Sequence, residues 1–203
     1  AAAVPVFMGK IFYLAGKSSS GKDTIYRNLL ECRQLQLKKL IPYTTRPIRA
    51  GEKNGREYFF TDEAGLEALR QSGKVIEERV YHTFHGPWYY FTVDDGQLDW
   101  ARQDYLMIGT LESFLAIKRY VGGSNIVPLY IEVDDGERLQ RALDRERKQE
   151  VPKYEEMCRR FLADSGDFSE EKITEAGIEK RFRNSSLEKC LEEVKEYIRP
   201  TRV

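Results

Sequence analysis

Short apolar runs alternate with amphipathic segments along most of this chain. The run KIFYLAG (10–16) is rich in β-forming residues and ends in glycine, and the segment after it spaces Ile25 and Leu29 on one helical face. Similar runs recur at 104–109 and 125–133, each followed by a helical pattern. Strands that alternate with helices build parallel sheets with both faces covered, so the pattern predicts an α/β fold with a doubly wound parallel sheet.

Two stretches depart from this alternation. Residues 44–93 contain the turn-rich RAGEKNGREYFF and the aromatic WYYFTV, which predict an inserted β-rich subdomain with one helix. Residues 147–177 are charged, helical in pattern and poor in large apolar side chains, which is typical of a mobile helical lid. The remaining segments, 8–43, 94–146 and 178–203, are predicted to form the core domain.

Composition narrows the class of protein. The 203 residues and 41% hydrophobic content allow one substantial core. The 33 basic and 33 acidic residues cancel, which argues against nucleic acid or an acidic membrane as partner. No apolar run approaches the roughly 20 residues of a membrane span, and three scattered cysteines favour a reducing compartment, so we expect a cytoplasmic protein. Residues 1–7, AAAVPVF, are interpreted as a cloning remnant, and the oligomeric state is left open.

The first candidate site is GKSSSGKDT at 16–24, where a predicted strand passes into a predicted helix. In this context GxxxxGK forms a phosphate-binding loop, or P-loop. Its glycines let backbone N–H groups turn inward, the helix N-terminus adds positive potential, and the lysine reaches the β and γ phosphates. The residues predicted to bind ATP here are Gly16, Ser18, Ser19, Gly21, Lys22, Asp23 and Thr24.

Asp23 occupies the position at which this loop usually carries a hydroxyl that ligates magnesium. A carboxylate is a hard oxygen ligand, so Asp23 could hold Mg²⁺ directly or through water, and Thr24 still offers a hydroxyl one position later. Without a metal, the same charge would repel a triphosphate. If the Asp23 side chain faces the site, we therefore predict that nucleotide binding depends strongly on magnesium.

A second cluster of phosphate-binding side chains follows in YTTRPIRAGEKNGREYFF (43–60). Arg46 and Arg49 lie three positions apart beside prolines, and Tyr58 belongs to the same turn-rich unit. Two guanidinium groups and a phenol make a good clamp for a phosphate. Downstream of a P-loop, this cluster indicates a phosphorylated acceptor.

At these residues the chain resembles the guanylate kinase family, whose signature after the P-loop reads TTRxxRxGExxGxxYxF. The positions that agree in identity and spacing are Thr44, Thr45, Arg46, Arg49, Gly51, Glu52, Gly55, Tyr58 and Phe60. The resemblance extends from about residue 8 to residue 198, and it is sparse beyond Val93.

The resemblance implies transfer of the ATP γ-phosphoryl group to GMP, with Mg²⁺ accompanying ATP, to give GDP and ADP. The implied GMP-binding residues are Arg46, Arg49 and Tyr58 for the phosphate and Glu77, Tyr90 and Thr92 for the base. The carboxylate of Glu77 can accept two guanine N–H donors that adenine does not present in that geometry, and a threonine hydroxyl can donate to guanine O6.

The same resemblance places catalytic arginines in the lid and an asparagine beside the ATP base. We expect Arg145 and Arg160 to act with Lys22 in neutralising the transferring phosphoryl group, because this chemistry needs mainly positioning and positive charge. The stretch RFRNSS aligns Asn184 with the asparagine near adenine.

Three positions depart from the family pattern. Pro42 stands where the family has a phosphate-binding serine, and Ile108 and Thr110 stand where it has the two acids of DxDxQG, which serve magnesium and substrate. We therefore predict that Asp23, or alternatively Glu112, supplies the missing carboxylate.

Three functions stay open at this stage. The favoured one is a divergent guanylate kinase. A binding module of guanylate kinase type, without catalysis, would explain the lost acids but not the intact glycines and lysine of the P-loop. A kinase for another phosphorylated acceptor would share the P-loop, yet it would explain Glu77 and Thr92 less well.

Overall fold

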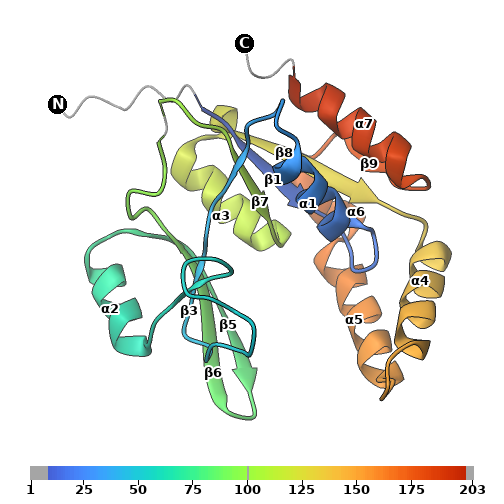
Figure 1. Ribbon diagram of the computed structural model, residues 1–203, viewed down its shortest axis with the longest axis horizontal. Helices are drawn as coiled ribbons and strands as arrows, with labels where there is room; N and C mark the ends of the chain where they lie inside the picture. The colour runs from blue at the N-terminus through green and yellow to red at the C-terminus, as the bar shows by residue number, and fades with distance from the viewer. Residues whose placement is uncertain (1–8, 100, 200–203) are drawn as a thin grey trace.

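The computed structural model describes residues 9–99 and 101–199 (Figure 1). The predicted cloning remnant at 1–7 lies outside these residues, as do positions 8, 100 and 200–203. Two β-sheets and the helices around them make up the described fold.

The central sheet has five strands in the order β2, β7, β1, β8, β9, and every described pairing in it is parallel. Its strands are β1 (Ile11–Ala15), β2 (Lys38–Lys39), β7 (Tyr105–Ile108), β8 (Ile126–Glu132) and β9 (Arg181–Arg183). All five residues of β1 are buried, as expected for the middle strand of a sheet covered on both faces. The predicted doubly wound α/β fold is confirmed.

Helices cover both faces of this sheet. Side chains alternate along its strands, so each strand presents apolar residues to both layers of helices. Phe12 and Leu14 point into one apolar cluster with α1 (Lys22–Glu31) and α7 (Leu187–Ile198). Ile11 and Tyr13 point into the other, which includes residues of α3 (Leu111–Val121). Figure 1 shows α1 and α7 together on one side of the sheet, with α3 apart from them. A short 3₁₀ turn, Gly123–Asn125, joins α3 to β8.

The second sheet, which we call the insertion sheet, has four strands in the order β4, β3, β6, β5. They are β3 (Tyr43–Thr44), β4 (Phe59–Phe60), β5 (Val75–Thr83) and β6 (Gly86–Val93), with α2 (Glu63–Gln71) packed on them. Leu66, Phe91 and Val93 form its own small core. The sequence predicted a β-rich insertion with one helix over 44–93, and the insertion sheet lies here and begins one residue earlier, at Tyr43.

One helix ends at the first residue of the predicted lid, 147–177, and two more lie within it. They are α4 (Asp135–Arg147), α5 (Tyr154–Asp167) and α6 (Glu170–Glu175), and α4 and α5 lie side by side (Figure 1). Phe168, Ile173 and Ala176 are buried in the apolar cluster that also holds Ile11 and Tyr13. The last third of segment 147–177 thus packs against the central sheet, while the division into core, insertion and lid stays a prediction.

Neither a membrane span nor a disulfide contributes to the described fold. Over 9–99 and 101–199, every helix is too short or too polar to cross a bilayer. The cysteines at 32, 158 and 190 are free. Packing and hydrogen bonds therefore hold these residues together.

Replacing Ile173 by alanine should reveal how firmly α6 is anchored. Its side chain is 1% exposed, so Ile173→Ala should lower the free energy of unfolding by about 2–5 kcal/mol. Leu162, which lies on α5 and is 70% exposed, is the control, and Leu162→Ala should change it by no more than about 0.5 kcal/mol. Urea denaturation measures both, and equal effects of the two substitutions would show that α6 is not packed on the core.

Candidate active site

The P-loop runs from the end of β1 into α1, and its two glycines are required by space and by backbone geometry. A Cβ on Gly16 would lie 2.6 Å from the carbonyl oxygen of Ile131 in the neighbouring strand β8. Gly21 has a φ of 83°, and a Cβ there would collide with the amide nitrogen of Asn184. Ser19 also has positive φ, 62°. The loop therefore curls tightly above the carboxyl end of the central sheet.

Asn184 supports this loop from below. Its backbone N–H donates to the Glu132 carbonyl at the end of β8 (2.9 Å), and its Nδ2 donates to the Ser20 carbonyl (2.9 Å). Its Oδ1 is buried without a hydrogen-bond partner. The contacts of Asn184 are thus with the P-loop, and its predicted place beside the ATP base stays a prediction.

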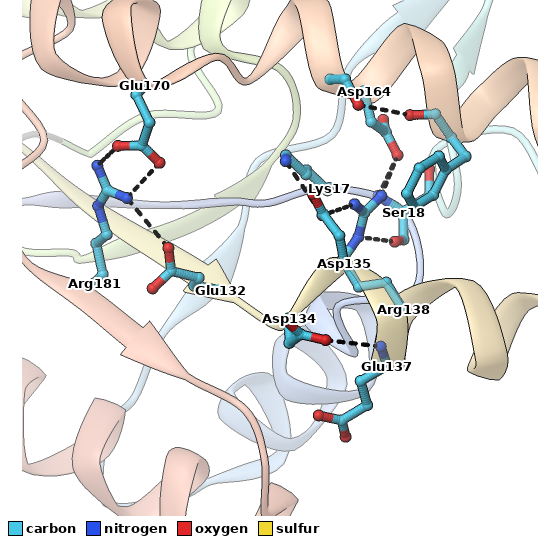
Figure 2. A network of polar contacts seen from close by, with 12 residues as sticks. Lys17, Ser18, Glu132, Asp134, Asp135, Glu137, Arg138, Asp164, Glu170 and Arg181 are labelled. Carbon is cyan, nitrogen blue, oxygen red and sulfur yellow. Dashed lines mark hydrogen bonds and ion pairs between the residues drawn. The ribbon is translucent and has the colours of Figure 1, made fainter.

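A buried arginine that sequence reasoning overlooked joins the P-loop to two helices. Arg138 of α4 is 1% exposed, and its Nε donates to the Ser18 carbonyl (2.9 Å) while its guanidinium pairs with Asp164 of α5 (3.0 Å). Asp164 also accepts from the Ser18 backbone N–H (2.8 Å), and Phe161 stacks on the guanidinium, 4.9 Å from its ring centre. Figure 2 shows Arg138 between Ser18 and Asp164. Both polar groups of the Ser18 backbone are therefore held by side chains of α4 and α5.

Further charges lie beside the loop, around a cavity of about 430 Å³. Asp135 accepts from Arg138 (2.6 Å) and from Lys17 of the loop (3.3 Å). On the other side of the view in Figure 2, Arg181 of β9 pairs with Glu132 (3.1 Å) and with Glu170 of α6. The ends of β8 and β9 thus carry a network of alternating charges next to the P-loop.

Lys22 and Asp23 begin α1, and they differ in exposure. The Lys22 side chain is only 19% exposed, whereas the Asp23 side chain is 82% exposed, and Nζ of the lysine lies 3.9 Å from the carboxylate. Asp23 therefore faces solvent at the first turn of the helix, where a ligand could reach it. Thr24, half-buried, follows on the same turn.

Both arginines predicted from the lid lie at the P-loop. Arg145 of α4 donates to the Ser19 hydroxyl (3.1 Å). Arg160 of α5 lines a small pocket together with Ser18, Ser19 and Arg145, and it also lies 3.7 Å from Glu156. The structure thus brings these two cations to the same loop that carries Lys22.

In the insertion sheet, Arg46 is held by Glu52. Two guanidinium nitrogens of Arg46 donate to the two carboxylate oxygens (2.8 and 3.0 Å), and the Arg49 backbone N–H donates to the same carboxylate (2.7 Å). The hydrogen bonds from Arg46 and from the Arg49 backbone hold the pKa of Glu52 at about 2, below its ordinary 4.5. The Arg46 guanidinium also lies 5.5 Å from the ring centre of Tyr58. Arg46 and Tyr58 are thus together, whereas Arg49 is exposed at the edge of the turn.

The predicted base-reading residues lie on two paired strands. In the register of β5 with β6, Glu77 is opposite Thr92, and Arg79 is opposite Tyr90. The Thr92 hydroxyl donates to Glu77 Oε1 (2.7 Å), and Tyr90 packs edge-on against Tyr58. Glu77, Tyr90 and Thr92 thus lie on the paired strands β5 and β6, and Tyr58 connects Tyr90 to Arg46.

Between the two sheets lies a cleft of about 380 Å³, which we call the inter-sheet cleft. Its lining residues are Tyr58, Arg79, Tyr81 and Tyr90 from the insertion sheet and Ile108 from the end of β7. Ile108, which stands where the resemblance predicts an acid, thus lines the cleft. Thr110, at the position of the second predicted acid, caps α3 by accepting from the Ser113 N–H (3.2 Å) and accepts the Tyr13 hydroxyl at its carbonyl (2.9 Å).

Sequence reasoning missed Arg138, Asp164 and Arg79. Arg138 precedes Ala142 and Glu146 at four-residue spacing, and these three are the buried positions of α4, so helical phase was an available signal. Asp164 looks like one more charge on a polar helix. Arg79 occupies the same face of β5 as Glu77, and only strand alternation could have pointed to it.

Comparison with known proteins agrees with this geometry. Residues 8–92 match the family model described as guanylate kinase. The guanylate kinase of Aromatoleum aromaticum is 40% identical over 81 residues, which are 40% of this chain and 38% of the relative. That of Nitrosomonas europaea is 37% identical over 75 residues, 37% of each chain. The chain thus matches less than two fifths of the length of these curated relatives. The residues matched by the family model contain the P-loop and the arginine cluster.

The fold resemblance covers more of the chain. The crystal structure of guanylate kinase from Anaplasma phagocytophilum superposes with a TM-score of 0.61 over 96% of this chain and 87% of that one, at 21% identity. The predicted resemblance to the guanylate kinase family is confirmed for the sequence of residues 8–92 and for the fold over 96% of this chain.

The depressed pKa of Glu52 predicts a pH effect on stability. A carboxyl with a lower pKa in the folded state stabilises the protein above its ordinary pKa of 4.5 and loses that contribution as pH falls towards 2. Glu52→Gln should therefore be less stable than the wild type at pH 7, and the gap should close between pH 4.5 and pH 2. Urea denaturation across this range measures the gap, and a gap of constant size would contradict the Arg46–Glu52 pairing.

Proposed function

We propose that this chain, which carries the guanylate kinase signature in residues 8–92 and has the guanylate kinase fold, is an ATP-dependent phosphotransferase that converts GMP to GDP. The observation that carries the proposal is the placement of two phosphate-binding clusters. One is the P-loop on the central sheet, and the other is the Arg46–Tyr58 pair on the insertion sheet, with the inter-sheet cleft between the sheets. Transfer of a phosphoryl group needs both phosphates held in line and shielded from water.

On the donor side, the proposal assigns ATP to the P-loop. The start of α1 and backbone N–H groups of the P-loop, other than that of Ser18, which donates to Asp164, would hold the phosphates, and Lys22 would contact the β and γ groups. Arg145 and Arg160, which flank Ser19, would neutralise charge that develops on the transferring group. Adenine recognition by Asn184 is part of the same proposal.

On the acceptor side, Arg46, Arg49 and Tyr58 would hold the GMP phosphate. Glu77, Thr92 and Tyr90 would contact the base from the paired strands β5 and β6. The nucleotide would then lie across the insertion sheet, with its phosphate directed to the central sheet. A cytoplasmic setting, where both substrates occur, belongs to the proposal too.

Magnesium is proposed as the companion of ATP. When bound, it would neutralise charge on the phosphates. The residues present fit such an ion, since Asp23 is an accessible carboxylate in the first turn of α1 and offers the hard oxygen ligands that Mg²⁺ takes. Glu112, exposed in the first turn of α3, is the second candidate.

A binding module without catalysis remains the alternative. The observation that favours it is the presence of Ile108 in the inter-sheet cleft and of Thr110 in a helix cap, where the family has acids. Against it stand Gly16, Gly21 and Lys22, which a module that only binds a phosphorylated partner does not need. A kinase with a different phosphorylated acceptor is the third possibility.

The proposal predicts ADP formation that depends on acceptor and on Lys22. A coupled assay with ATP, Mg²⁺ and a panel of nucleoside monophosphates should detect ADP with GMP. Lys22→Met should reduce the rate by about 10² or more, because an electrostatic contact to the transferring group is lost. Lys180→Met, on a surface lysine paired with Glu193, is the control and should keep wild-type rates. Release of ADP with a different acceptor and none with GMP would favour the third possibility, and no release with any acceptor would favour the binding module.

The magnesium proposal has a separate test. Asp23→Ala should shift the Mg²⁺ titration of the same reaction to higher concentration, because one ligand of the ion is removed. Glu112→Ala should leave the midpoint unchanged. A shift with Glu112→Ala alone would transfer the role to Glu112, and no shift with either would refute a carboxylate ligand at these positions.

A further inference from the structure

Arg79 lies in the inter-sheet cleft, and neither the P-loop nor the phosphate clamp accounts for it. It projects from β5 opposite Tyr90 and lines the cleft with Tyr58 and Ile108. Burial raises the pKa of Tyr13 in the central sheet, and the charge of Arg79 acts in the opposite direction. Burial likewise raises the pKa of Tyr58, beside the insertion sheet, and the charge of Arg79 again acts in the opposite direction. The guanidinium is thus close to side chains of both sheets.

The carboxylate that should read guanine is already engaged. Glu77 has a side chain only 4% exposed, and its Oε1 accepts the Thr92 hydroxyl at 2.7 Å. Its Oε2 lies 3.4 Å from Arg79 Nε. A guanine edge would have to compete for this carboxylate with a positively charged group, and contacts between two charged groups are the stronger ones.

Arg79 has unused hydrogen-bonding capacity. Its Nε–H is buried and has no hydrogen-bond partner, although the side chain as a whole is 22% exposed. Buried donors without a partner are uncommon and costly. The Nε faces Glu77, and the exposed part of the guanidinium lines the inter-sheet cleft, where an acceptor atom of a ligand can reach it.

We propose that Arg79 is a specificity-determining residue that reads the base edge of the acceptor nucleotide together with Glu77. This inference rests on the proposed function. With Arg79 present, the site offers guanidinium donors where a carboxylate alone would offer only acceptors. It therefore takes a purine nucleoside monophosphate whose C2 position presents an oxygen acceptor as readily as one whose C2 position presents an amino donor.

Three nucleotides test recognition of the C2 substituent separately from recognition of the ribose phosphate. GMP, IMP and XMP share the ribose phosphate, and they carry an amino group, a hydrogen and an oxygen at C2. Glu77 favours the amino group, because a carboxylate only accepts hydrogen bonds, and Arg79 favours the oxygen, because a guanidinium only donates them. The ratio of kcat/KM for GMP to that for XMP therefore reports which side chain dominates.

The wild type should accept XMP at a rate comparable with GMP, and Arg79→Ala should raise the GMP:XMP ratio roughly tenfold or more, the size of one hydrogen bond to a charged group. Two effects add in this variant, because Glu77 becomes free for guanine while XMP loses its donor. Arg79→Gln, of similar length but neutral, should move the ratio in the same direction. Arg70→Ala is the matched control, since Arg70 pairs with Glu78 and Glu67 on the outer face and should leave the ratio unchanged.

Binding of the same nucleotides, followed by calorimetric titration of the full chain, decides the inference independently of catalysis. If no acceptor is phosphorylated, the proposed function fails, and a GMP:XMP affinity ratio that rises in Arg79→Ala still supports the role of Arg79. If Arg79→Ala does not unfold cooperatively, Arg79→Gln decides. An unchanged ratio in a folded variant, or a wild type that rejects XMP as strongly as the variant does, would overturn the inference.

Discussion

The candidate site depends on one buried charge, the guanidinium of Arg138. A cation with 1% exposure is tolerated only because Asp135, Asp164 and the Ser18 carbonyl surround it. Removing one member of such a buried pair typically costs about 3–5 kcal/mol, since the other charge is left without compensation. The contacts of Arg138 and Asp164 hold the P-loop, α4 and α5 together. Arg145 and Arg160 therefore reach the loop from helices that are packed against it. Asn184 also holds the P-loop, because its Nδ2 donates to the carbonyl of Ser20.

The charge pattern of the inter-sheet cleft links structure to specificity. The resemblance predicts acids where this chain has Ile108 and Thr110, and the nearby face of β5 carries a cation, Arg79. The cleft is therefore more positive than a cleft with both acids and no arginine would be. Phosphoryl transfer can tolerate such a change if a carboxylate near the P-loop serves magnesium, because the reaction requires mainly that charge be balanced around the transferring group. In that case the negative charge of the exposed Asp23 near the P-loop offsets the positive charge that Arg79, paired with Glu77, brings to the cleft.

Much of the fold could be predicted from the sequence, because buried strands such as β1 and turn-rich segments such as 51–58 have local signals. The P-loop and the Arg46–Tyr58 cluster were accessible for the same reason, since their chemistry depends on spacing along the chain. Contacts between distant segments were not accessible. Arg138 lies 120 residues from Ser18, and the packing of Ile173 against the central sheet depends on how α6 folds back, which no short window of sequence contains. Arg79 was overlooked because a charged residue on a strand normally faces solvent.

In the proposed function, the two phosphate-binding clusters cooperate in moving one phosphoryl group from ATP to a nucleoside monophosphate. Phosphorus NMR of the full chain mixed with ATP, Mg²⁺ and GMP follows every phosphorus atom in that exchange. We predict that loss of the ATP γ signal is matched by the β signals of ADP and GDP in equal amounts, with little inorganic phosphate, because the acceptor phosphate held beside the P-loop takes the phosphoryl group in place of water. Inorganic phosphate as the only new species, or a spectrum that does not change with time, would contradict it.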